Sequence, residues 1–163
     1  MGSRSWLDVD PESPFSLANI PFGIVSTPSD PSPRPAIVIG DYTLDLQAFA
    51  SNSGFAQLPV ISQNIDVFSQ PTLNSFAALG QSTHRQVRKY LQEVLSDNGP
   101  YKSVLEQNPE LQRKVLVPLK DVKSHLPMHI GDYTDFYAGR NHAYNVSISC
   151  SAADFVVRVE PET

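Results

Sequence analysis

The chain has 163 residues, which fits one domain, or one domain with part of another, and is enough to bury a core without disulfide bonds. Its formal net charge of −5, with no basic run, argues against a nucleic-acid surface or an anionic-membrane surface. The single cysteine, Cys150, excludes an intramolecular disulfide and a metal site built from several thiolates. No apolar run is long enough to cross a membrane, so we expect a soluble, cytoplasmic protein.

The first third of the chain has the pattern of short β-strands. "FGIVST" and "AIVIG" are β-branched runs, and apolar residues alternate with polar ones in the following "YTLDL". Gly40 and Asp41 stand between the last two runs, where Gly40 can take a positive φ and Asp41 can hydrogen-bond the local backbone. The sequence therefore predicts a β-hairpin that turns at Gly40 and Asp41.

After Phe49 the pattern becomes helical. Thr72 is placed to cap a first helix over "LNSFAALG", and Thr83 and Gln86 have the spacing of a capping box for a second helix. Apolar residues share one face in each helix: Leu73, Phe76 and Ala77 in the first, and Val87, Tyr90, Leu91, Val94 and Leu95 in the second.

A third helical stretch is predicted from Tyr101, with a break before Pro109 and a restart in which Asn108 is the cap and Pro109 the first helical residue. His84, in the second helix, has no His, Asp or Glu three or four residues away, the spacing that metal-binding pairs on helices use. We therefore interpret His84 as a solvated or capping histidine, and these helices as scaffold.

From Pro118 onward the chain is dense in groups that bind metals or transfer protons. Within thirteen positions lie Asp132, Tyr133, Asp135, Tyr137, Arg140, His142 and Tyr144. On an ideal helix Asp135 and His142 would lie on one face, where a cation or a polarised water could bind between them. The alternative is a solvated helix N-terminus, capped by Asp132 or Thr134.

One segment, "LPMHIGDYTDFYAGRNHAYNV", resembles the signature of the fumarylacetoacetases. These enzymes of tyrosine and phenylalanine breakdown split fumarylacetoacetate into fumarate and acetoacetate. "SPFSLANIPFGIVST", "AIVIGDYTLDL" and "QPTLNSFAALGQSTHRQVR" resemble the N-terminal domain of the same family, its fungal members above all. The resemblance covers residues 5 to 146.

The resemblance implies an α+β fold with four parts. An N-terminal extension, residues 1 to 14, precedes a small SH3-like β-barrel with helices, residues 15 to 118. The start of a mainly β catalytic domain, residues 119 to 146, carries the active-site motif, and residues 147 to 163 form a tail that does not match the family. The pentapeptide "IGDYT" occurs in both domains, as residues 39 to 43 and 130 to 134, and this repetition is a coincidence.

The resemblance also implies roles for single residues. Asp135 corresponds to a ligand of the family's Ca²⁺ or Mg²⁺, Tyr137 to a substrate contact, and His142 to the general base that deprotonates water. The implied partner is the small molecule fumarylacetoacetate, with self-association into a homo-oligomer also compatible with the family.

After "NHAYNV" the chain departs from the family pattern, which continues to an arginine that contacts substrate where Ser151 stands here. The catalytic domain is therefore expected to be missing and the isolated chain inactive; a translated intron, a frameshift or an engineered end could each produce such a tail. Two other functions stay open from the sequence. The chain could be a non-catalytic interaction or oligomerisation module, or a small cation-binding module.

Overall fold

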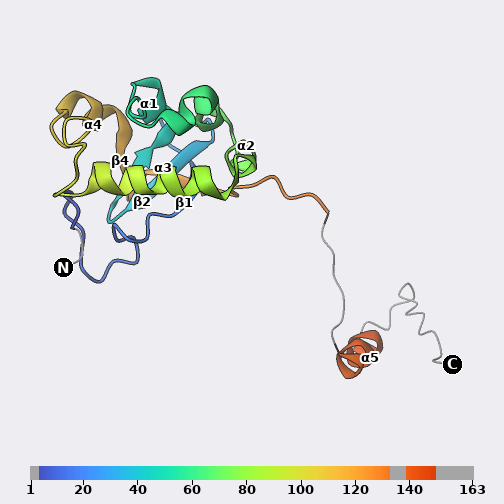
Figure 1. Ribbon diagram of the computed structural model, residues 1–163. Coiled ribbons are helices and arrows are strands. Elements are labelled where there is room, and N and C mark those ends of the chain that lie inside the picture. The colour runs from blue at the N-terminus through green and yellow to red at the C-terminus, as the bar shows by residue number, and fades with distance from the viewer. Residues whose placement is uncertain (1–3, 133–138, 150–163) are drawn as a thin grey trace. The chain divides into compact units, whose positions relative to one another are not determined.

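The computed structural model describes residues 4–132 and 139–149, and it has a mixed α+β fold built on an antiparallel sheet (Figure 1). The strands are β1 (Phe22–Ser26), β2 (Arg34–Ile39), β3 (Tyr42–Asp45), β4 (Leu116–Pro118) and β5 (Lys123–His125), in the sheet order β4-β3-β2-β1-β5. The helices are α1 (Leu46–Ser51), α2 (Asn74–Ala78), α3 (Gly80–Leu95), α4 (Pro109–Val115) and α5 (Arg140–Ser149), with 3-10 helices η1 (Pro59–Ser69) and η2 (Leu119–Asp121). The predicted α+β class is confirmed.

The chain divides into two compact units, residues 1–129 and 130–163. The first unit contains the sheet and all helices from α1 to η2. In the second unit the described element is α5, ten residues long. No helix among residues 4–132 and 139–149 is long and apolar enough to span a bilayer.

The predicted hairpin is confirmed and joins β2 to β3. Ile39 pairs with Tyr42 across the turn, and Gly40 has a φ of +52°, a conformation that glycine takes at little cost. The strand ends earlier than the alternation suggested, because the Asp45 carboxylate accepts a hydrogen bond from the Ala48 amide (2.9 Å) and caps α1 from Leu46 onward.

The apolar stripe predicted for α3 is confirmed, but its predicted capping box is wrong. All five stripe residues are buried. The helix begins at Gly80, so Thr83 lies inside it, and no side chain caps the N-terminus. Leu79 ends α2 and precedes α3 directly, so the two helices follow one another without the loop that a capping box requires.

Two further local predictions are wrong. Thr72 does not cap α2, which begins at Asn74 with Leu73 at its N-cap and with Ala77 exposed. The segment 100–107 forms turns and not a helix, whereas the predicted restart at Pro109 is confirmed, since the Asn108 side chain accepts from the Leu111 amide (3.1 Å). Segment 100–107 is stabilised by contacts with residues distant in sequence: the Tyr101 ring packs on the Tyr90 ring of α3, with ring centroids 4.8 Å apart.

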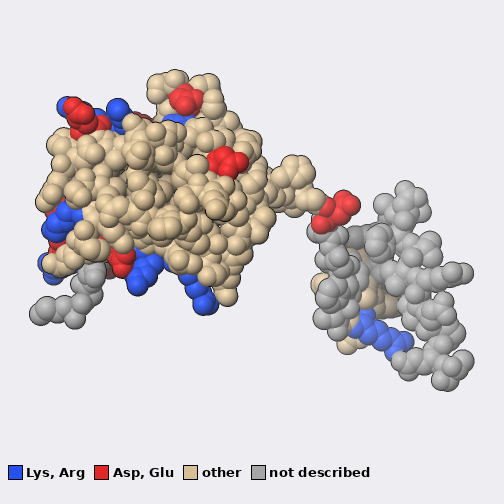
Figure 2. Space-filling view, turned by 45° about the horizontal axis from the view of Figure 1, so that its top comes forward, with Lys and Arg blue, Asp and Glu red and all other residues tan. Residues whose placement is uncertain are grey.

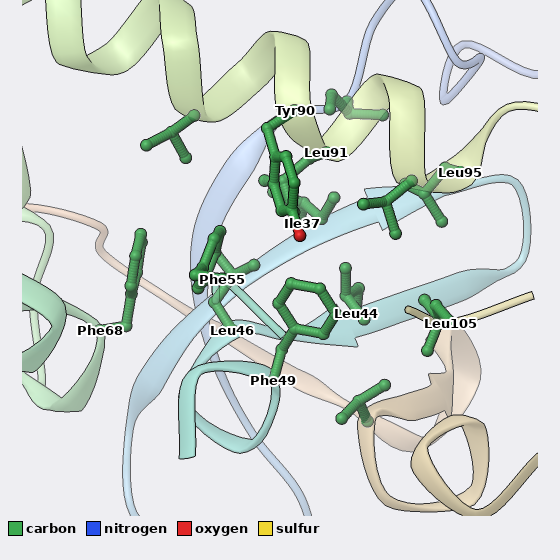
Figure 3. Close-up of a cluster of buried hydrophobic side chains, with 14 of the residues drawn as sticks. Ile37, Leu44, Leu46, Phe49, Phe55, Phe68, Tyr90, Leu91, Leu95 and Leu105 are labelled. Carbon is green, nitrogen blue, oxygen red and sulfur yellow. The ribbon is translucent and has the colours of Figure 1, made fainter. Parts of the chain in front are cut away.

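The hydrophobic core lies where α3, α1 and η1 meet the sheet (Figure 3). Side chains of α3, among them Tyr90 and Leu91, point toward Ile37 of the sheet in this view. Phe55 stacks on Phe68 with centroids 4.7 Å apart. Fully burying one such side chain contributes roughly 1.5–3 kcal/mol, so this cluster is the main source of stability for the first unit.

A buried ion pair joins the start of β2 to the end of β3. The Arg34 guanidinium donates through Nε to the Asp45 carboxylate, and both side chains are nearly inaccessible to solvent. Arg34 also donates to the carbonyl oxygens of Asp30 and Ser32, each at 3.2 Å. The pair therefore fixes the β1–β2 loop to the start of α1.

Candidate functional site

The residues that the sequence analysis assigned to a site lie in the second unit. Asp135 and Tyr137 are outside the described residues. His142 lies in the first turn of α5, with an exposed side chain, and the Ala143 amide donates to the Gly139 carbonyl (3.1 Å) to close that turn. The assigned roles of all three residues therefore stay predictions.

A divalent-metal site needs several oxygen ligands, about six or more for Ca²⁺. Across residues 4–132 and 139–149, no three His, Cys, Asp or Glu side chains gather in a group that could hold a metal ion. The described residues therefore show no such group, and Asp135, the proposed ligand, is not among them.

Of the two predicted roles, solvated or capping, the structure shows the capping one for His84. Its Nε2 lies 2.8 Å from the Phe76 carbonyl oxygen, in the last turn of α2, and its ring packs on the Phe76 ring with centroids 4.8 Å apart. The same carbonyl oxygen also accepts from the Leu79 amide (3.1 Å), so the imidazole adds a second contact at the end of α2. This histidine is part of the scaffold.

The surface of the first unit carries open pockets, and one of them gathers polar side chains that the sequence analysis did not single out. It has a volume of about 480 Å³ and lies between the β1–β2 loop and the segment from Lys120 to His125. His125 is held there by a hydrogen bond between its Nε2 and the Ser26 hydroxyl (2.8 Å). In the sequence the basic residues of this pocket lie in the run "LKDVKSH". Only the pairing of β5 with β1 places that run beside the β1–β2 loop.

Acidic and basic side chains are otherwise dispersed. On the face shown in Figure 2, Lys and Arg lie in small groups among Asp and Glu, and neutral residues cover most of the described surface. This face has no extended basic patch of the kind that binds nucleic acid.

Comparison with known proteins identifies the first unit. The family described as "Fumarylacetoacetase N-terminal" matches residues 18–127, from the segment before β1 to just beyond β5. The chain belongs to the fumarylacetoacetase family. The match includes the whole sheet and all the helices that cover it, so the fold described above is that of the N-terminal region of a fumarylacetoacetase.

Individual fumarylacetoacetases are similar over most of this chain. The chain is 59% identical over 144 residues to "Fumarylacetoacetase fahA" of Aspergillus fumigatus and 60% identical over 144 residues to the fumarylacetoacetase of Emericella nidulans. The human fumarylacetoacetase is 42% identical over 144 residues. In each case the similarity covers 88% of this chain and 33% of the relative, so the chain spans about a third of the length of these relatives.

Proposed function

We propose that this chain forms the N-terminal domain and the first active-site segment of an enzyme that hydrolyses fumarylacetoacetate to fumarate and acetoacetate. The observation that carries the proposal is the identity of 59–60% with two fungal fumarylacetoacetases over 144 of 163 residues. The same similarity supports a role in tyrosine and phenylalanine breakdown and a small-molecule substrate.

We further propose that the sheet closes into a small SH3-like barrel. Its edge strands β4 and β5 are separated by residues 119–122 alone. The five peptide steps from Pro118 to Lys123 reach at most about 18 Å when extended, and η2 shortens that reach. The edges of a flat five-stranded sheet would be about 19 Å apart, so the short link supports strong curvature.

The division after residue 118, with a tail from residue 147, stays a proposal. β5 lies beyond residue 118 and pairs with β1, with His125 opposite Ile24. This pairing favours a division after His129, where the first compact unit ends. The catalytic segment would then begin with the second copy of "IGDYT".

In the proposed reaction, His142 takes the proton from the water that attacks a carbonyl carbon of the β-diketone. Imidazole suits this task because it exchanges protons near neutral pH. Tyr137 contacts the substrate, and Asp135 contributes oxygen ligands to a divalent cation, Ca²⁺ or Mg²⁺. When bound, that cation would polarise substrate oxygens and stabilise the enolate released by cleavage of the carbon–carbon bond.

The 163 residues alone are expected to be inactive. The reaction requires a base, a group that orients it, oxyanion donors and a cation with several further ligands, and a single missing oxyanion donor costs about 10²–10³ in rate. Asp135 provides at most two oxygens. The missing groups would come from residues equivalent to the other two thirds of the relatives.

The test is an assay of fumarylacetoacetate hydrolysis with calcium present. The 163-residue chain is compared with a fusion of residues 1–146 to the remainder of the Aspergillus fumigatus relative. We expect the fusion to turn over and the short chain not to do so, and His142→Ala in the fusion to lower kcat by about 10²–10⁴. His84→Gln in the same fusion is the control, because His84 caps a helix and should leave kcat unchanged. A fusion that keeps its activity with His142→Ala would refute the assigned base.

A further inference from the structure

The pocket between the β1–β2 loop and residues 120–125 has an unusual charge for this protein. Among the residues that line it are Lys120, Lys123 and His125, against a single carboxylate, Asp121. The chain as a whole carries a net charge of −5. The pocket is therefore a local concentration of cationic groups on an acidic protein.

The two lysines of the pocket differ from the other lysines of the chain. Of the five lysines, Lys89 and Lys102 form ion pairs with Glu93 and Glu106, at 3.8 Å and 3.3 Å. Lys114 donates to the Asn52 side chain at 3.1 Å. Lys120 and Lys123 make no ion pair or side-chain hydrogen bond within residues 4–132 and 139–149.

His125 lines this pocket and is held in a defined position. The β1–β5 pairing places it opposite Ile24, and its Nε2 lies 2.8 Å from the hydroxyl of Ser26, which is only 5% exposed. One ring nitrogen is thus engaged by the scaffold. The ring is oriented before any ligand arrives, which lowers the entropic cost of binding.

The β1–β2 loop, with Pro28 and Pro31, also lines the pocket and is fixed by its own hydrogen bonds. The Thr27 amide donates to the Asp30 carbonyl (2.9 Å), and Arg34 donates to the carbonyls of Asp30 and Ser32 from its buried pair with Asp45. The Ser32 amide bonds to the Asp30 carboxylate, and this lowers the pKa of Asp30. That carboxylate also lies 3.5 Å from Arg34, so its charge is balanced within the loop.

We propose that this pocket binds a small dianion, of the class that includes inorganic phosphate and short dicarboxylates. Two ammonium groups without partners can approach the two charges of such a ligand, and the oriented imidazole can donate to one of its oxygens. Asp121 offsets one positive charge and leaves the other available. The site belongs to the first unit, and it is independent of the proposed hydrolysis.

The experiment titrates the 163-residue chain with phosphate, and separately with succinate, at fixed pH and at an ionic strength held constant with potassium chloride. The readouts are the ring-proton resonances of His125, assigned by their loss in His125→Gln, and the thermal midpoint. We expect a saturable shift of the His125 resonance with a roughly millimolar dissociation constant. At ten times that constant the midpoint should rise by about 4–5 °C.

The paired variants make the test specific. Lys120→Gln with Lys123→Gln should weaken binding at least tenfold, whereas Lys89→Gln with Lys102→Gln removes the same charge and should leave binding unchanged. A response to both ligands supports recognition of the two charges. A response to phosphate alone supports a natural ligand that carries a phosphate group. No saturable shift with either ligand, or an equal loss in both double variants, would overturn the proposal.

Discussion

At the scale of single residues, breaking the Arg34–Asp45 pair should lower the free energy of unfolding more than any other substitution described below. Asp45→Asn keeps an oxygen that can cap α1 but leaves the buried Arg34 with the half-exposed Asp30 carboxylate, 3.5 Å away, as its ionic partner. Breaking a buried pair in this way typically costs 3–5 kcal/mol, so we expect the free energy of unfolding to fall by about 3 kcal/mol. Urea denaturation followed by circular dichroism measures this change in the free energy of unfolding.

The matched control for Asp45→Asn is Glu93→Gln, which removes one partner of a pair with the exposed Lys89. Exposed pairs contribute about 0–1 kcal/mol. Similar losses of stability in the two variants would show that burial does not strengthen the Arg34–Asp45 interaction.

Tyr90 should make the first unit sensitive to alkali. Burial, with a smaller contribution from Tyr101, raises the pKa of Tyr90 to about 12. The unfolded chain loses the tyrosine proton near pH 10, whereas the folded state keeps it, so the free energy of unfolding should decrease as the pH rises from about 10 to 12. The loss should be on the order of 2 kcal/mol.

Denaturation at a series of pH values tests this, with Tyr90→Phe as the comparison. The variant loses the hydrogen bond from the phenol to the Gly54 carbonyl (2.6 Å) and starts less stable, but its stability should change less between pH 10 and 12. Parallel curves for the two proteins would contradict the assignment to Tyr90.

At the scale of elements, the N-terminal segment is docked on the end of α3. The Trp6 indole donates to the Val94 carbonyl (3.0 Å), and Ser5 donates to the Leu95 carbonyl (3.0 Å). Trp6→Ala should therefore destabilise the first unit by about 2 kcal/mol, through lost packing and a lost hydrogen bond. Thermal unfolding measures the effect.

The control for Trp6→Ala is Tyr144→Ala, which truncates an aromatic side chain that is 67% exposed. Such a change normally alters stability by less than about 0.5 kcal/mol. If Trp6→Ala changes the stability as little as Tyr144→Ala does, the N-terminal segment does not contribute to the stability of the unit.

At the scale of the whole molecule, residues 1–129 should fold without the remainder. This unit contains the sheet and the buried hydrophobic core, and within the described part of the chain no strand of the sheet comes from beyond His125. We expect a chain ending at His129 to unfold cooperatively, with a thermal midpoint within about 2 °C of that of the 163-residue chain. A large drop in the midpoint would show that the second unit stabilises the first.

Local patterns were enough to predict several elements. The hairpin follows from β-branched runs around Gly40, the buried face of α3 from its 3.6-residue period, and the start of α4 from Asn108 and Pro109. Family membership also followed from the sequence, because several segments matched in order. These features depend on residues close together in the chain.

Other features needed the tertiary structure. The predicted cap at Thr83 is wrong because α2 leads directly into α3. The predicted cap at Thr72 is wrong because α2 begins at Asn74, after Leu73, whose amide donates to the distant Pro127 carbonyl (2.7 Å). β4 and β5 have three residues each, too short for a period to be read, and they form only because β3 and β1 offer free edges.

The sequence by itself determined the family, the hairpin and the amphipathic face of α3. The roles of Asp135, Tyr137 and His142 stay predictions. Tertiary structure alone decided that Arg34 pairs with Asp45 and that Ser26 meets His125, 99 residues away. The physical reason is that periodicity and turn chemistry act over a few residues, whereas burial, ion pairing and pocket charge depend on which distant segments pack together.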